Sequence, residues 1–212
     1  MATMDELAIE TPRGEARAHV GHPTGTGRRE PPGALVLSHG AGGGVNAPDI
    51  QAATSAALSV GFAVALVEQP YRVAGRRGPA PAGHLDEAWC AVIARLGEGA
   101  LAGMALVTGG RSLGARVACR TAAATGAVGV LCLAFPLAPP SRRGAATPAA
   151  SRLPELDAVT VPTLVIQGRS DRFGMPPDGP NRAVVQVDGD HGLKRDLPAV
   201  RAATAEWLAG LG

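Results

Sequence analysis

Aromatic side chains, cysteines and net charge are all scarce in this sequence of 212 residues. Phe, Tyr and Trp together make up 3% of the chain, so a folded core has to be aliphatic. The three cysteines are an odd number at scattered positions, which fits free thiols and gives no zinc or disulfide pattern. A formal net charge of +2 is too small to indicate a nucleic-acid partner, so we expect none.

Long apolar runs are also missing. No stretch reaches the roughly 18 uninterrupted apolar residues of a membrane span. Residues 1–14 carry Asp5, Glu6 and Glu10 and lack the apolar segment of a signal peptide. These absences favour a cytoplasmic protein without a membrane partner. Hydrophobic residues nevertheless reach 46%, which is enough for one globular domain of this length.

Short apolar runs alternate with segments of helical periodicity along most of the chain. The runs predict core strands at 34–37, 62–67, 104–108, 128–135, 161–167 and 183–187. The periodicity predicts helices at 49–60, 85–96, 113–125 and 197–208. An edge strand or hairpin is expected at 7–20, and loops at 21–33, 68–83 and 136–154. The sequence therefore predicts one α/β domain over residues 1–212, with a mostly parallel sheet, helices on both faces and no separate cap domain.

A G-x-S-x-G pattern lies between the expected strand at 104–108 and the following helix. It consists of Gly110, Arg111, Ser112, Leu113 and Gly114. The chain has to turn sharply from strand to helix, so the serine takes a strained backbone conformation and the two glycines avoid clashes. The alternative is an ordinary glycine-rich turn. In this context we expect Ser112 to be a nucleophile whose Oγ projects above the sheet.

A serine nucleophile needs a base, and His191 lies where the base is expected. It follows the last strand and precedes the last helix, in the chain order serine, acid, histidine. His19 and His22 come before the core begins. The alternative for His191 is a solvated loop histidine.

The acid is expected in the loop after the strand at 161–167, where Asp171 stands. A buried carboxylate there would fix the imidazole tautomer and stabilise the imidazolium. The alternative is a surface ion pair of Asp171 with Arg169 or Arg172. Three further carboxylates compete for the role: Asp178, Asp188 and Asp190.

Acyl transfer also needs backbone N–H groups that stabilise an oxyanion. We expect one from Leu113 and one from Ala41, with Gly42 as second choice, because the run 39–44 follows the first core strand. A phosphate-binding loop is disfavoured, since Val45 stands at the position of the third glycine in G-x-G-x-x-G. His39 is interpreted as a brace for this loop.

Five segments together resemble one branch of the α/β-hydrolase superfamily: 37–43, 109–114, 134–137, 167–174 and 189–191. This dienelactone-hydrolase-like branch includes testis-expressed hydrolase-like proteins and a subunit of a chromatin acetyltransferase complex. The resemblance implies a triad of Ser112, Asp171 and His191 that hydrolyses an ester, thioester or amide. Dienelactone hydrolases proper use a cysteine nucleophile, and Ser112 here departs from that pattern.

The predicted function is that of a serine hydrolase, carboxylesterase-like or thioesterase-like, that acts on a small acyl substrate without metal or organic cofactor. Two alternatives stay open: a non-catalytic binding or scaffold protein on the same fold, and acyl transfer to an acceptor other than water. Arg111, with Tyr71 and Arg72 from the loop at 70–77, could favour an acidic substrate. The alternative is that these arginines pair with nearby carboxylates.

Overall fold

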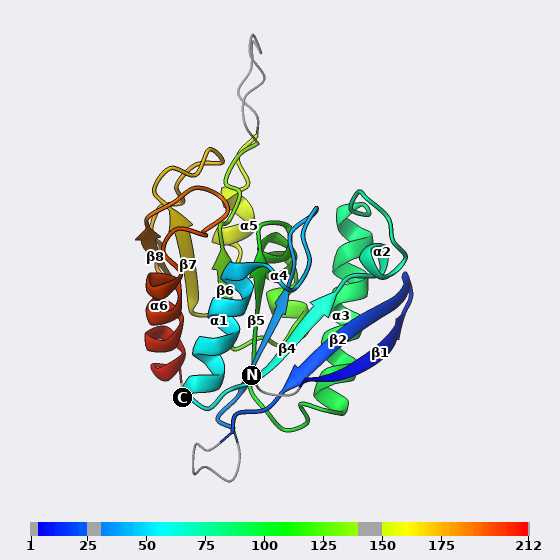
Figure 1. Ribbon diagram of the computed structural model, residues 1–212. Helices are drawn as coiled ribbons and strands as arrows, with labels where there is room; N and C mark the ends of the chain where they lie inside the picture. Colours follow the sequence, from blue (N-terminus) through cyan, green and yellow to red (C-terminus); the bar gives the residue numbers. More distant parts are fainter. Residues whose placement is uncertain (1–3, 25–30, 140–149, 212) are drawn as a thin grey trace.

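The computed structural model describes residues 4–24, 31–139 and 150–211. One eight-stranded sheet runs through its centre in the order β1-β2-β4-β3-β5-β6-β7-β8 (Figure 1). The strands are β1 Asp5–Thr11, β2 Gly14–Gly21, β3 Ala34–Ser38, β4 Ala63–Glu68, β5 Leu106–Arg111, β6 Gly129–Leu133, β7 Thr163–Gly168 and β8 Arg182–Val187. The helices are α1 Pro48–Ser59, α2 Pro70–Val73, α3 Ala82–Glu98, α4 Leu113–Thr125, α5 Leu153–Asp157 and α6 Leu197–Ala209.

The sheet is parallel from β4 to β8 and antiparallel at its first edge. β1 and β2 form an antiparallel hairpin, and β2 pairs antiparallel with β4. The remaining neighbours pair in parallel. The mostly parallel sheet and the hairpin alternative for residues 7–20 are thus confirmed.

Helices cover both faces of the sheet. α1 and α6 lie side by side on one face, while α3, α4 and α5 lie on the other (Figure 1). Every residue of β3 and β7 is buried, as expected for strands covered on both sides. The core is built mainly from Ala, Val, Leu and Ile, in line with the scarcity of aromatic residues.

Two short helices lie in segments where the sequence predicted loops. α2 falls within 68–83, and α5 overlaps the end of 136–154. Each has a proline in its first turn, where the missing N–H has no helical partner to lose. The loop prediction was wrong there because proline disrupts the interior of a helix but is tolerated in its first turn. Residues 140–149 of the second connection lie outside the described residues, as does 25–30 of the loop at 21–33.

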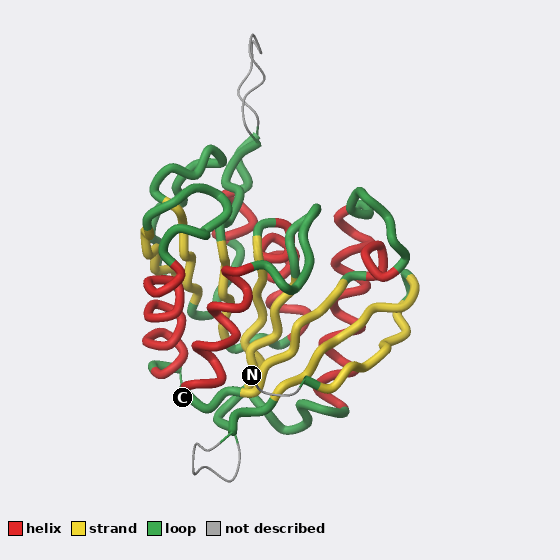
Figure 2. The backbone as a smooth tube through the Cα atoms, in the orientation of Figure 1, coloured by secondary structure: helices red, strands yellow, loops and turns green. Residues whose placement is uncertain are grey.

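The carboxyl ends of the parallel strands point to one edge, where the loops after β3, β5, β7 and β8 gather (Figure 2). Sites in such sheets form at this edge. In the part of the chain that the structure describes, no connection builds a separate cap domain over the edge, and no helix is long and apolar enough to cross a bilayer.

Candidate active site

Ser112 sits at the sharp turn between β5 and α4. Its backbone has φ 53° and ψ −101°, a conformation that residues other than glycine rarely adopt. Such a residue costs about 1–3 kcal/mol and persists only where its surroundings hold it. One contact that stabilises this conformation is the hydrogen bond that the Ser112 N–H donates to the carbonyl oxygen of Leu133 over 2.9 Å. Ser112 is thereby fixed above the sheet at its carboxyl edge.

The two glycines of the turn are needed for close contact with the end of β3. A Cβ at Gly110 would lie 2.5 Å from the carbonyl oxygen of Ser38. A Cβ at Gly114 would lie 2.5 Å from the same oxygen. Both distances are far below van der Waals contact. Side chains at these positions would therefore push the turn away from the loop that follows β3.

His191 and Asp171 complete a hydrogen-bonded line with Ser112. Nε2 of His191 lies 2.9 Å from Oγ of Ser112, and Nδ1 lies 2.8 Å from Oδ2 of Asp171. An ionised carboxylate can only accept, so Nδ1 carries the proton and Nε2 is the acceptor for the serine hydroxyl. The structure thus brings together the three side chains that the sequence singled out.

The carboxylate of Asp171 is wholly buried and receives two further hydrogen bonds. The side-chain amide of Gln167 donates to Oδ2 over 2.8 Å, and the Phe173 N–H donates to Oδ1 over 2.9 Å. The Phe173 ring also packs against the His191 imidazole, with centroids 4.3 Å apart. Sequence reasoning did not single out Gln167 or Phe173. The signal for Gln167 was a lone polar residue in an apolar strand.

The alternatives for the acid are engaged elsewhere. Arg169 pairs with the exposed Asp188 at 3.3 Å rather than with Asp171. Asp190 accepts from the Gly192 N–H, and Asp178 accepts from the Val184 N–H. In the described residues none of these three carboxylates contacts the imidazole of His191.

Ala41 and Gly42 belong to the loop after β3, which approaches the nucleophile at Gly40, where an added Cβ would lie 3.7 Å from Cβ of Ser112. Their N–H groups, like that of Leu113, donate to no acceptor among the residues that the structure describes. Gly43 differs, because its N–H donates to the carbonyl oxygen of Gly40. Three unengaged N–H groups near a nucleophile are what an oxyanion site requires.

His39 and Tyr71 are hydrogen-bonded to the backbone of this loop. His39 is 1% exposed, its Nε2 accepts from the Gln69 N–H over 3.1 Å, and its Nδ1 donates to the Gly40 carbonyl oxygen over 2.9 Å. Burial lowers the pKa of His39, which keeps the ring neutral. Burial also raises the pKa of Tyr71 to about 12, and its hydroxyl donates to the Ala41 carbonyl oxygen over 3.0 Å. The bracing role expected for His39 agrees with these contacts.

Comparison with known proteins identifies the family. A family model described as an alpha/beta hydrolase domain matches residues 31–198, which is most of the chain. This chain belongs to the α/β-hydrolase family. No curated protein matches this α/β-hydrolase.

Solved structures share the fold of this α/β-hydrolase at low sequence identity. An α/β serine hydrolase without a lid from Xanthomonas campestris has a TM-score of 0.73 at 21% identity, over 96% of this chain and 92% of that one. Est1E from Butyrivibrio proteoclasticus has a TM-score of 0.75 at 15% identity, over 97% and 98%. A dienelactone hydrolase from Anabaena variabilis has a TM-score of 0.72 at 16% identity, over 98% of each chain. These structures show the shared fold, and the family model confirms the superfamily resemblance seen in the motifs.

The three residues expected to contact substrate have different surroundings in this α/β-hydrolase. The guanidinium of Arg111 is bound to Asp49 and to the His191 backbone, which favours the structural alternative for this arginine. Tyr71 is 3% exposed, and its hydroxyl donates a hydrogen bond to the Ala41 carbonyl oxygen. Arg72 is half-buried in α2 and keeps its place as a candidate contact.

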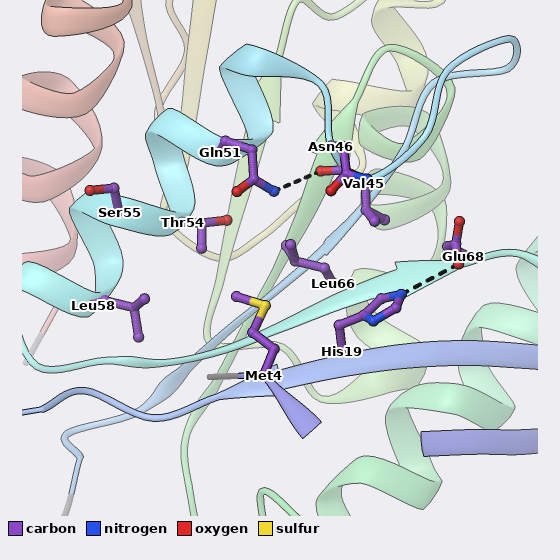
Figure 3. A pocket seen from close by; sticks show the side chains of 10 residues that line it. All are labelled: Met4, His19, Val45, Asn46, Gln51, Thr54, Ser55, Leu58, Leu66 and Glu68. Atoms are coloured by element: carbon purple, nitrogen blue, oxygen red, sulfur yellow. Dashed lines mark hydrogen bonds and ion pairs between the residues drawn. The ribbon is translucent and has the colours of Figure 1, made fainter. Parts of the chain in front are cut away.

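A cavity of about 650 Å³ lies away from this site. It runs between α1 and the sheet, over β4 and β2 (Figure 3). Its wall is apolar at Met4, Leu58 and Leu66, and His19 and Glu68 form a polar pair at 3.4 Å. None of the triad side chains lines it. The cavity and the hydrogen-bonded side chains therefore lie at different places in the fold. The candidate active site is the one at Ser112, His191 and Asp171, because these side chains have the chemistry for acyl transfer. Within the described residues, no cluster of His, Cys, Asp or Glu could hold a metal ion.

Proposed function

We propose that this α/β-hydrolase is a serine hydrolase that cleaves an ester, thioester or similar acyl bond of a small molecule. The observation that carries the proposal is the line Ser112–His191–Asp171, with contacts of 2.9 and 2.8 Å. The tautomer that this line requires leaves Nε2 free to take the serine proton. The positive φ of Ser112 adds support, since a strained backbone persists where the fold holds it.

The first half-reaction acylates Ser112. Its Oγ attacks the substrate carbonyl carbon while the hydroxyl proton passes to Nε2 of His191. The N–H groups of Leu113 and Ala41, with Gly42 as second choice, stabilise the oxyanion of the tetrahedral intermediate. The bond to the leaving group then breaks, and the leaving oxygen or sulfur takes the proton from Nε2.

The second half-reaction frees the enzyme. Water gives a proton to Nε2 as its oxygen attacks the acyl carbon, and the proton then returns to Oγ as the carboxylic acid departs. Asp171 stays ionised throughout and stabilises the imidazolium at both steps. All groups in this cycle belong to the protein, the substrate or water.

The test is an ester panel with the wild type and Ser112→Ala. The panel contains p-nitrophenyl acetate, butyrate and octanoate, an acyl thioester, and methyl ferulate, since one similar structure is Est1E with ferulic acid bound. We expect hydrolysis of at least one member by the wild type and a loss of about 10⁴-fold or more in Ser112→Ala. Ser59→Ala, at the exposed end of α1, should behave as wild type.

Two results would contradict hydrolysis. A folded wild type inactive on the whole panel would favour the binding or scaffold alternative. Product formation only after addition of an alcohol or amine would indicate acyl transfer to that acceptor.

A further inference from the structure

Arg111, the residue directly before Ser112, directs its side chain away from solvent towards the first turn of α1. Its Nε lies 3.0 Å from Oδ2 of Asp49. The Arg111 side chain is 20% exposed and the Asp49 side chain is 0% exposed. The pair therefore joins the end of β5 to the start of α1 in the interior.

The charge of Arg111 favours the ionised form of the buried Asp49 carboxyl group. Burial raises its pKa, and the charge of Arg111 acts in the opposite direction, followed by the backbone N–H groups at the start of α1. A buried carboxylate without such compensation is strongly unfavourable. The ion pair with Arg111 thus offsets part of the cost of burying the Asp49 carboxylate.

The same guanidinium reaches the loop of the base. Nη2 of Arg111 donates to the carbonyl oxygen of His191 over 3.0 Å. A guanidinium is planar and rigid, and offers donors in fixed directions, so one group can face the carboxylate and the carbonyl at once. One side chain therefore joins the residue next to Ser112 to the backbone of His191.

We propose that Arg111, anchored by Asp49, is a positioning residue that fixes the His191 backbone and so keeps Nε2 within reach of Ser112 Oγ. This inference rests on the proposed hydrolase function. It differs from the acidic-substrate role that the sequence suggested for Arg111, because the guanidinium is committed to two protein groups. A displacement of about 1 Å at such a site costs on the order of 100-fold in rate.

The test separates positioning from stability with three variants: Arg111→Met, Asp49→Asn and the double variant. Each single change leaves one buried charge or donor group without its partner and should lower Tm. The double variant removes both and should recover most of that loss. Because Arg111 is absent in the double variant, we expect its kcat to remain on the order of 100-fold below wild type, with KM within about twofold.

A second readout needs no substrate. We expect the proton between Nδ1 of His191 and Oδ2 of Asp171, which lie 2.8 Å apart, to give a low-field proton NMR resonance in the resting protein. We expect this resonance to shift or broaden in the double variant even where Tm has recovered. Arg13→Met with Glu87→Gln is the matched control, since this arginine–carboxylate pair at 2.6 Å lies on the β1–β2 turn and α3. It should change neither kcat nor the resonance.

Three outcomes would overturn the inference. Recovery of kcat together with Tm in the double variant would mean that the pair only stabilises the fold. A rise in KM confined to anionic esters would mean that Arg111 binds substrate. An unchanged resonance in the double variant would show that the His191 position is independent of Arg111, even if the wild type cleaves no ester and the hydrolase proposal itself fails.

Discussion

Gln167 donates its side-chain amide to the same oxygen of Asp171 that faces Nδ1 of His191, over 2.8 Å. Gln167 is fully buried at the end of β7. Its amide nitrogen also lies 3.0 Å from the Phe135 carbonyl oxygen and 2.9 Å from that of Gly174. The orientation of the Asp171 carboxylate is therefore fixed by Gln167 at the end of β7 as well as by the loop to which Asp171 belongs.

Replacing Gln167 by leucine should slow the reaction while the chain still folds. A hydrogen bond to a charged group contributes about 1.5–3 kcal/mol, which corresponds to roughly ten- to a hundredfold in rate if it is lost in the transition state. We expect a loss of that size in kcat on whichever ester the wild type cleaves. Gln186→Leu, at an exposed position of β8, is the matched control. Equal rates for the two variants would remove Gln167 from the account.

Asp171→Asn should leave the fold intact and lower kcat by about 10⁴-fold, because an amide can hold the imidazole in the wrong tautomer. The comparison is with Asp188→Asn, whose carboxylate is exposed and paired with Arg169. That variant should keep wild-type activity. If Asp188→Asn were the slower of the two, the acid would have been assigned to the wrong residue.

How much of this site was predictable depends on whether a residue belongs to a short motif. Ser112, Asp171 and His191 follow the parallel strands β5, β7 and β8, whose carboxyl ends lie at one edge of the sheet. Chain order alone could therefore select them. Gln167 belongs to no motif, and a strand that ends in glutamine gives only a weak signal.

The Arg111–Asp49 pair shows what the sequence does not reveal. The structure brings together a residue of the serine turn and one at the start of α1, and no local pattern relates them. The same applies to α2 and α5, whose first-turn prolines look like loop residues until packing against the sheet and α4 is considered. Local periodicity predicted the long helices and buried strands because their own residues carry the pattern.

The buried His39 should make stability depend on pH. Its pKa is lowered from 6.5 by burial, so the unfolded chain binds a proton at a higher pH than the native protein does. The free energy of unfolding should therefore fall as pH drops below 6.5 towards the lowered pKa, and this contribution should be constant above 6.5. Urea unfolding at pH 7.5 and 5.5 measures the effect.

His39→Gln should lose less stability between these two pH values than the wild type, because glutamine does not titrate. His22→Gln, at an exposed position, is the control and should follow the wild type. A His39→Gln protein with the full wild-type pH dependence would mean that another group causes it.

The cavity beside α1 should be dispensable for the chemistry. Ser55 lines it from an exposed position on α1, and leucine there would fill part of the space. We expect Ser55→Leu to change kcat and KM by no more than about twofold, like Ser59→Leu one turn further along α1. A large rise in KM in Ser55→Leu alone would show that substrate occupies this cavity.

The most direct test of Ser112 as the nucleophile is covalent labelling by a fluorophosphonate probe, followed by intact mass and peptide mapping. An activated serine displaces fluoride and keeps the phosphonyl group. We expect one adduct, located on Ser112, that is absent in Ser112→Ala and strongly reduced in His191→Ala. An unlabelled, folded wild type, or an adduct that persists in Ser112→Ala, would contradict this assignment.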